Sequence, residues 1–224
     1  MDEHRFDTVT RALGRTIGRR GALGGMAAGA ALLGGAAASA RGRKTGAPGI
    51  APQGVETFTE KAGVYDPDKT GCVVAKWQKK AGLKDQKGKK RQGLVLQKNC
   101  PTETNAAPGA EIVGAQGIAL SQLGFDVKGS CGAGSPRFNV FTASDYSAGY
   151  FVGCTYGLPG IDMGSDFTRV RFTASDFVPF GGAPAFEYGS TQVFYVEIVA
   201  DEQGQSVIDN IAINGYVIDK KSKK

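Results

Sequence analysis

Short apolar runs separated by Gly, Pro, Asn and Asp make up the chain from residue 58 onward. The runs are rich in β-branched and aromatic residues, and several alternate apolar with polar positions, which is the period of a strand with one buried face. Within 167–177, for example, Val170 and Phe172 alternate with Arg169 and Arg171. No long helical period appears in this region. The pattern therefore predicts an all-β domain.

The run at 193–200 is nearly continuously apolar, as expected of a strand inside a sandwich. Paired runs predict two hairpins, one of which turns in the Ser144–Ser147 region. We expect loops at 101–111, 155–166 and 178–190, and a single antiparallel β-sandwich built from the remaining segments. The predicted strands are one within 57–71 and then 72–77, 93–100, 111–120, 123–130, 137–142, 149–154, 167–177, 191–203 and 206–219.

The segment Asp66–Gly71 matches the start of a calcium-binding loop, D-x-D-x-T-G. A full loop of that kind needs a glutamate eleven residues after Asp66, where Trp77 stands, so an EF-hand is excluded. Pro and Asp favour a tight turn and Gly closes it. The segment is therefore interpreted as a β-turn.

The first forty residues follow a different pattern. A charged stretch ends in Arg19 and Arg20, a run of small apolar residues follows, and Ala38 and Ala40 frame a cleavage site before a basic residue. This order predicts a twin-arginine export signal. The alternative is an uncleaved membrane anchor, which the abundance of glycine and the scarcity of leucine disfavour.

We divide the chain into a signal peptide at 1–40, a flexible Pro/Gly linker at 41–57, the β-sandwich domain at 58–219 and a basic tail at 220–224. The mature protein is then secreted or held at the cell surface. It meets the twin-arginine translocon during export and keeps no stable membrane span after cleavage.

All four cysteines, Cys72, Cys100, Cys131 and Cys154, lie in the part predicted to be exported. An even number there predicts two disulfides, with three connectivities open, and free thiols as the alternative. In an antiparallel hairpin, the position numbers of facing residues have a constant sum. The midpoint between Cys72 and Cys100 falls inside the loop of the first predicted hairpin, so a Cys72–Cys100 bridge is geometrically natural there. The second hairpin is compatible with a Cys131–Cys154 bridge. No CxxC pair supports a zinc site.

The only histidine is His4, inside the predicted signal. The mature chain therefore has neither a Ser-His-Asp or Cys-His nucleophile system nor a histidine-ligated metal. Its charge is uneven: residues 99–219 carry 4 basic and 13 acidic groups, whereas the loop 79–91 is rich in lysine. That loop suits attachment to an anionic envelope polymer or simply solubility. Without interleaved aromatic residues it does not indicate specific nucleic-acid binding.

The order GVYDPDKTGCVVAKW, GLVLQKNCPTETNAAPGAEI, CGAGSPRFNVFT, YFVGC, TRVRFTASD and VIDNIAING resembles a family of uncharacterised secreted bacterial proteins with twin-arginine signals. The resemblance covers nearly the whole mature chain and implies no catalytic residue. The closing pattern VFYVEIVADEQGQSVIDNIAING is similar to the last two strands of galactose-binding-like jelly rolls, which are common in carbohydrate-binding modules. It implies a jelly-roll-like sandwich. In such modules an acid of the last strand sometimes helps to hold a structural calcium, a place that Asp209 occupies here; no other cofactor is expected.

The leading hypothesis is a non-catalytic module that binds a glycan or another cell-envelope polymer. Exposed aromatic rings stack on the apolar faces of sugars, and Trp77, Tyr146, Tyr156 and Tyr188 lie on or near predicted loops. The alternative for each ring is packing in the core or across strands.

Two other hypotheses stay open. A glycoside hydrolase needs only two carboxylates flanking the scissile bond. Glu197 interrupts the apolar run at 193–200, and burial there would raise its pKa and suit a general acid. The third hypothesis is a structural component of the cell surface, which large flat apolar patches would favour. The carboxylates available to a hydrolase are Asp162, Asp166, Asp176, Glu187 and Glu197.

Overall fold

The computed structural model describes residues 58–84, 88, 91–132, 134–159 and 166–218. The predicted signal peptide, linker and basic tail lie outside the described residues, as do Asp162 and residues 85–87 and 89–90 of the lysine-rich loop. Within the described part of the chain, the helices are two short 3-10 turns, η1 (Cys154–Tyr156) and η2 (Ala174–Asp176). No helix of that part is long and apolar enough to cross a membrane.

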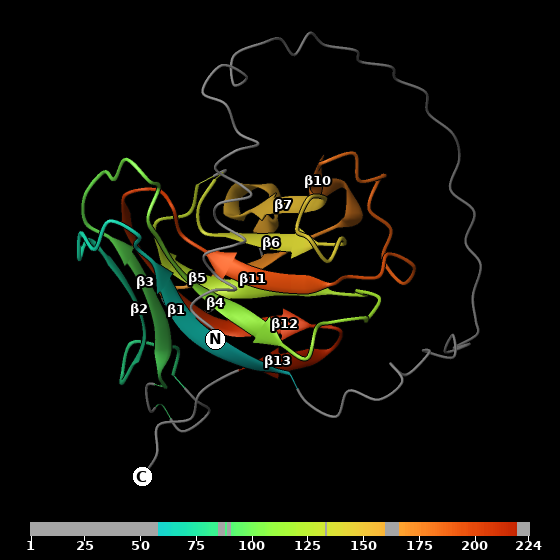
Figure 1. The fold of residues 1–224 in the computed structure, drawn as a ribbon. Helices are drawn as coiled ribbons and strands as arrows, with labels where there is room; N and C mark the ends of the chain where they lie inside the picture. The colour runs from blue at the N-terminus through green and yellow to red at the C-terminus, as the bar shows by residue number, and fades with distance from the viewer. Residues whose placement is uncertain (1–57, 85–87, 89–90, 133, 160–165, 219–224) are drawn as a thin grey trace, which may run out of the picture.

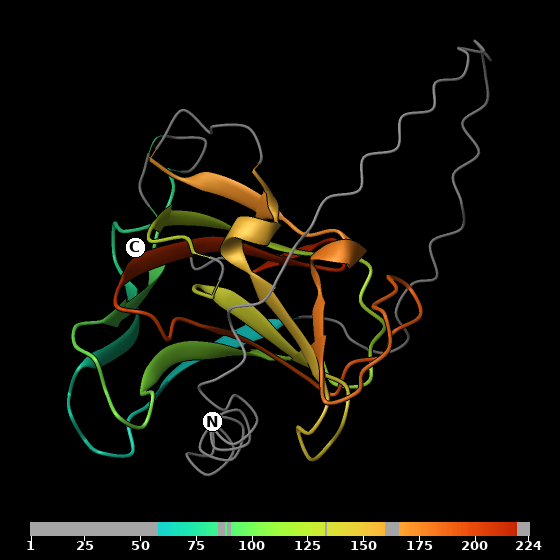
Figure 2. The ribbon, with the colours of Figure 1, turned by 90° about the horizontal axis from the view of Figure 1, so that it is seen from above.

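The strands form two antiparallel sheets that pack face to face (Figures 1 and 2). The prediction of an all-β sandwich is confirmed. Sheet A contains, in spatial order, β1 (Thr59–Tyr65), β4 (Ala107–Val113), β11 (Tyr195–Val199), β6 (Arg137–Phe141), β7 (Gly149–Gly153) and β10 (Val178–Phe180). Sheet B contains β2 (Val73–Gln78), β3 (Gly93–Lys98), β12 (Gly204–Ile213), β5 (Leu123–Gly129), β9 (Thr168–Arg171) and β8 (Leu158–Pro159), with β13 (Tyr216–Ile218) paired to β12.

The chain crosses repeatedly between the two layers, which gives the jelly-roll-like arrangement expected from the sequence. After β1 in sheet A it forms β2 and β3 in sheet B, returns for β4, and crosses again for β5. The hairpin β6–β7 belongs to sheet A, β8 and β9 to sheet B, β10 and β11 to sheet A, and β12 and β13 to sheet B. Strands that are distant in sequence therefore become neighbours, and β11 lies between β4 and β6.

The core lies between the two sheets and consists of the side chains that point inward from each strand. Phe125 of β5, Phe138 of β6 and Phe172 after β9 pack against one another with ring centroids 5.4–6.0 Å apart. Each is 6% exposed or less. Burying a large apolar side chain stabilises a fold by about 1.5–3 kcal/mol. This layer is the rigid base on which the outward side chains are placed.

Several of the predicted strands and loops were wrong in their bounds. The strand expected over 111–120 begins at Ala107, and Ile118 and Leu120 enter the core from a loop. An apolar run thus reached the core without being a strand. The segment 206–219 is two strands, because Asn214 takes a left-handed conformation, φ 48°, in the turn between them. Short strands β8 and β10 also form within segments expected to be loops.

Both predicted disulfides are confirmed: Cys72–Cys100 and Cys131–Cys154. The register of the first hairpin differs by one residue from the prediction, since Val73 faces Lys98 and the Asn99 N–H donates to the Cys72 carbonyl. The two cysteines are therefore diagonal neighbours rather than direct partners.

The turn predicted at Asp66–Gly71 is confirmed. The Lys69 N–H donates to the Asp66 carbonyl at 3.0 Å. One carboxylate oxygen of Asp66 accepts from the Thr70 N–H at 3.0 Å, and the other accepts from the Gly71 N–H at 2.8 Å. The aspartate closes its own turn and thereby holds the chain just before Cys72.

Candidate functional site

The outward face of sheet A carries a row of polar side chains across its centre. On β11, Val196 and Ile198 point into the core, so Glu197 between them points outward. Glu197 lies opposite Glu111 of β4 on one side and Asn139 of β6 on the other. Directly opposed residues share a face of the sheet, so these three side chains form one row.

Glu197 is the centre of a hydrogen-bonded network. Its carboxylate is 1% exposed. The Asn139 Nδ2 donates to Glu197 Oε1 at 2.7 Å, and the Tyr195 hydroxyl donates to Oε2 at 3.4 Å. Both carboxylate oxygens are thus engaged by donors from the protein, which is the usual requirement for a buried carboxyl group.

The network continues through Arg137 to the end of the sheet. Its Nε donates to Asn139 Oδ1 at 2.8 Å, and its Nη1 donates to Asp201 Oδ2 at 2.6 Å and to the Gly134 carbonyl at 2.8 Å. The guanidinium also lies over the ring of Phe151, 5.1 Å from its centroid. Arg137 therefore joins the polar row to the aromatic part of the same face.

Burial and charge shift the acidity of this network. Burial, assisted by the nearby Glu111, raises the pKa of Glu197 to about 7, although Asn139, Arg137 and Tyr195 oppose the shift. Burial also raises the pKa of Tyr195, and the charges of Glu197 and Glu111 add to that effect. The sequence-based expectation that burial would raise the pKa of Glu197 is confirmed.

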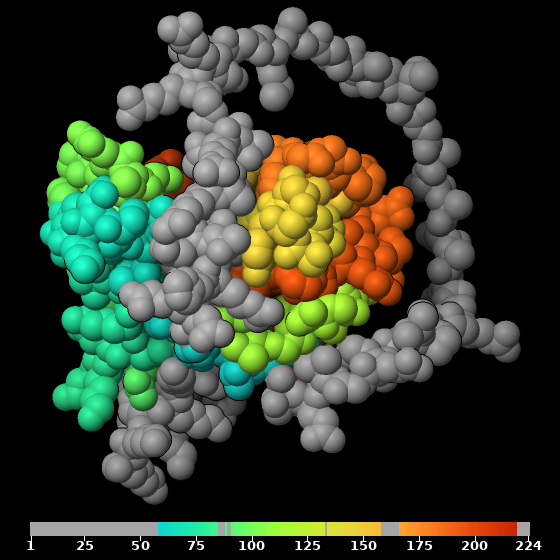
Figure 3. All heavy atoms as spheres, in the orientation of Figure 1, coloured from blue at the N-terminus to red at the C-terminus, as the bar shows by residue number. Residues whose placement is uncertain are grey.

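Aromatic rings border the polar row on one side. Tyr146, in the β6–β7 turn with a left-handed φ of 60°, packs edge to face on Phe141 and on Tyr195. Phe194 contacts Tyr146, and the ring of Phe180 lies against Phe141. Figure 3 shows the β6–β7 turn, the approach to β11 and the loop after β4 gathered on one side of the molecule. We call the polar row, Arg137, Asp201, Phe151 and these rings the sheet A face.

A pocket of about 150 Å³ opens at the edge of the sheet A face. It lies where β4 ends and β11 begins, and both the partly buried Glu111 and Tyr195 line it. The pocket is thus lined by one carboxylate, that of Glu111, and one phenol, that of Tyr195. Its lining residues are Glu111, Ile112, Val113, Gly114, Ala115, Gln116, Phe194 and Tyr195.

The four aromatic residues proposed from the sequence do not gather in one place. Tyr146 belongs to the sheet A face, whereas Trp77 packs against the main core from β2. Tyr156 is 48% exposed in η1. Tyr188 donates its hydroxyl proton to the Phe172 carbonyl at 2.9 Å and packs edge to face on Phe177 and Phe186.

Among the proposed carboxylates that the structure describes, only Glu197 lies in the sheet A face. Asp176 closes η2 by accepting from the Thr173 N–H and hydroxyl, and Glu187 accepts from Ser190 in a surface turn. Asp166 pairs with Lys128 on sheet B. These contacts give each of the three a local structural partner.

Asp209 lies on the outward side of sheet B and is fully buried. Its Oδ2 accepts from the Leu83 N–H at 2.8 Å, its Oδ1 accepts from the Asn210 N–H at 2.8 Å, and Arg91 lies 3.7 Å away. These neighbours are donors and a cation, whereas calcium takes oxygen ligands. The described part of the chain contains no group of three acidic, histidine or cysteine side chains that could hold a metal ion. The contacts of Asp209 therefore do not fit a calcium site.

Sequence reasoning missed Glu111, Asn139, Arg137 and Asp201. The signal that could have found Asn139 is the same one that identified Glu197: a polar residue inside an apolar run, here RFNVF. The pairing of these two residues across β11 and β6 links segments 58 positions apart, and no local pattern reveals it.

No protein-family model and no curated protein sequence matches the chain. Among solved structures, the family 11 carbohydrate-binding module from Clostridium thermocellum in complex with a β-1,3-1,4-mixed-linked tetrasaccharide is 16% identical, with a TM-score of 0.40; the match covers 74% of this chain and 93% of that one. The family 11 module of the C. thermocellum cellulase Lic26A-Cel5E is 15% identical, with a TM-score of 0.39 and coverages of 76% and 92%. A β-1,2-glucanase from Parabacteroides distasonis is 14% identical with a TM-score of 0.39, covering 72% of this chain and 22% of that one. No role of any residue follows from likenesses of this size.

Proposed function

We propose that the protein is a non-catalytic module that binds a glycan through the sheet A face. The observation that carries this proposal is the position of Glu197. A carboxylate that is 1% exposed lies on the outward side of a sheet, tied to Asn139 and through it to Arg137. Burying polar groups is costly even when they are paired, so such a network on an outer face suits a recognition surface better than simple packing.

The chemistry of the face suits sugars. Sugar hydroxyls both donate and accept hydrogen bonds, and planar amide, guanidinium and carboxylate groups present fixed donors and acceptors to them. Aromatic rings offer apolar surface with a defined orientation. Glu111, Phe151 and Arg137 are only partly buried, so each has a portion of its side chain available to a ligand. The buried Glu197 and Asn139 act as the support that fixes them.

The proposed place of action is outside the cytoplasm, at the cell surface or in the medium. Two disulfides form and persist in oxidising compartments. Export through the twin-arginine pathway stays a prediction from the first forty residues.

One observation favours a second candidate, a glycoside hydrolase. Glu197 has a pKa near 7 and lies directly opposite Glu111. Opposed side chains in a sheet have Cβ atoms about 4.5–5.5 Å apart, and paired carboxylates at short range are the machinery of glycoside hydrolysis. However, both oxygens of Glu197 are engaged by Asn139 and Tyr195, which leaves neither free to protonate a leaving group.

A glycan array probed with the purified chain at low and moderate salt tests the proposal. Saturable binding to a neutral saccharide that survives moderate salt supports the module. Absence of binding across the array would contradict it. Incubating the bound saccharide with the protein and measuring new reducing ends separates the two candidates, because a non-catalytic module releases none.

A further inference from the structure

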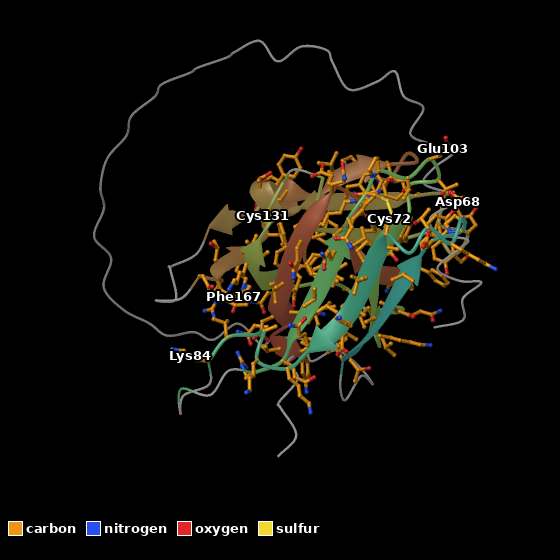
Figure 4. The ribbon with its side chains drawn as sticks, turned by 90° about the vertical axis from the view of Figure 1, so that its left-hand side faces the viewer. Asp68, Cys72, Lys84, Glu103, Cys131 and Phe167 are labelled. Atoms are coloured by element: carbon orange, nitrogen blue, oxygen red, sulfur yellow. A yellow bond between two sulfur atoms is a disulfide. The ribbon has the colours of Figure 1, made fainter. Side chains whose placement is uncertain are left out.

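A second buried charge cluster lies on the outward face of sheet B, on the opposite side of the sandwich from the sheet A face. Figure 4 shows the molecule from this side, with Phe167 and Lys84 labelled. Asp126 of β5 and Asp209 of β12 are direct cross-strand partners, and neither has any exposed surface. Two adjacent buried carboxylates repel each other strongly unless cations accompany them. Here three guanidinium groups do so, those of Arg91, Arg169 and Arg171.

The two arginines of β9 are held in fixed positions. Arg169 lies opposite Asp126 and donates to it through Nε at 3.0 Å and Nη2 at 3.3 Å. Arg171 donates through Nη1 to the carbonyls of Phe125 at 3.1 Å and Val170 at 2.8 Å. Residues two apart on a strand lie on the same face about 6.6 Å apart, so the two guanidiniums are neighbours. Their orientation does not depend on a ligand.

Gly124 gives Arg171 the room it needs. The two residues are cross-strand partners, and a Cβ atom on Gly124 would lie 2.6 Å from Arg171 Cδ and 2.9 Å from its Nη1. The arginine side chain therefore lies flat across β5 at the position of the glycine. A side chain at residue 124 would lift the guanidinium out of this position.

Each of the two arginines keeps donors that no described residue accepts from. The hydrogen bonds of Arg169 use Nε and Nη2, and those of Arg171 use only Nη1. The side chains are 35% and 28% exposed, respectively. Two preorganised guanidiniums with free donors facing solvent form a receptor for planar anions.

We propose that the Arg169–Arg171 pair binds the carboxylate groups of an acidic polysaccharide made of uronic acid units. Asp126 occupies the Nε–Nη2 edge of Arg169, which leaves Nη1 of Arg169 for a second carboxylate. The neighbouring ring on this face, Phe167, is 3% exposed, so it offers no platform for a nucleic acid base. A pair of guanidinium groups at the surface binds a single carboxylate weakly, and a polymer with repeated carboxylates gains affinity by multivalency. The site is independent of the sheet A face.

Titration of the purified chain with polygalacturonate, with neutral dextran as the control polymer, tests this site. Because charged hydrogen bonds contribute about 1.5–3 kcal/mol, Arg171→Gln should weaken polygalacturonate binding about tenfold or more. Arg171→Lys keeps the charge but loses the fork and should also weaken binding several-fold. Arg171 is the residue of choice, since Arg169 is the main partner of Asp126 and its loss endangers the fold.

The matched control is Lys76→Gln, which removes the same charge from the same face of sheet B but on β2, four strands away from β9. It should change the affinity less than threefold. Arg171→Lys binding as tightly as the unaltered chain, or Lys76→Gln weakening it as much as Arg171→Gln, would overturn the site. Tighter binding of single-stranded DNA than of polygalacturonate would overturn the assignment to a polysaccharide. Glu111→Gln, on the sheet A face, should leave polygalacturonate binding unchanged. Failure of the Arg169–Arg171 site can therefore be told from failure of glycan binding by the sheet A face.

Discussion

Glu197 and Glu111 lie directly opposite each other on neighbouring antiparallel strands, with both side chains on the outward face of sheet A. Like charges in this position destabilise a sheet. Burial already disfavours the ionised form of Glu197, and the charge of Glu111 adds to that effect, so its pKa rises from 4.5 to about 7. The centre of the sheet A face thus changes charge near neutral pH.

The first prediction concerns stability against pH. A carboxyl group whose pKa is higher in the folded state makes the folded state bind more protons than the unfolded state, so the free energy of unfolding falls as pH rises from about 4.5 to about 7. Glu197→Gln removes this dependence and should be more stable than the unaltered chain at pH 8, by up to roughly 3 kcal/mol. Urea unfolding at pH 5 and pH 8 measures both effects. If the free energy of unfolding depends on pH in the same way in both proteins, Glu197 is ionised throughout this range, and the prediction is wrong.

The second prediction concerns the disulfides. The purified chain should have no titratable thiol under denaturing, non-reducing conditions, since all four cysteines are paired. Replacing Cys131 and Cys154 together by serine opens a loop closed over a sequence separation of 23. This should lower the free energy of unfolding by about 3 kcal/mol. An unchanged urea midpoint in the double variant, or four free thiols in the parent, would refute the pairing.

The third prediction concerns the turn before Cys72. Although burial opposes the shift, hydrogen bonds from Gly71 and Thr70 lower the pKa of Asp66. Asp66→Ala removes these bonds and should lower the melting temperature by about 2–4 °C at neutral pH. The matched variant Asp68→Ala loses only the bond from Thr104 and should have a smaller effect. Because the lowered pKa stabilises the fold above the usual pKa of aspartate, the difference between Asp66→Ala and the parent should shrink as pH falls below 4.

Local pattern was sufficient for much of the sandwich. Paired apolar runs identified both hairpins, and the polar interruption of an apolar run singled out Glu197. It failed at Ile118 and Leu120, where an apolar segment reaches the core as a loop. The physical reason is that burial, which the pattern reports, does not require a strand.

The candidate site depended on pairings that a single sequence does not reveal. Asn139 and Glu111 meet Glu197 only because β11 inserts between β4 and β6, and the order of strands in a sheet is a long-range property. Trp77 shows the converse case. Its place near a predicted loop suggested exposure, but the register of β2 on β3 turns the ring toward the core.

The most direct test of the central claim is the glycan array repeated with Phe151→Ala and Asn99→Ala. Phe151 is the partly exposed ring under Arg137 on the sheet A face, and Asn99 is an exposed residue at the end of β3 in the other sheet. The proposal predicts that Phe151→Ala weakens binding to the recognised saccharide at least tenfold, while Asn99→Ala leaves it unchanged and both variants stay folded. Equal binding by folded Phe151→Ala and the unaltered chain would contradict the assignment of glycan binding to this face.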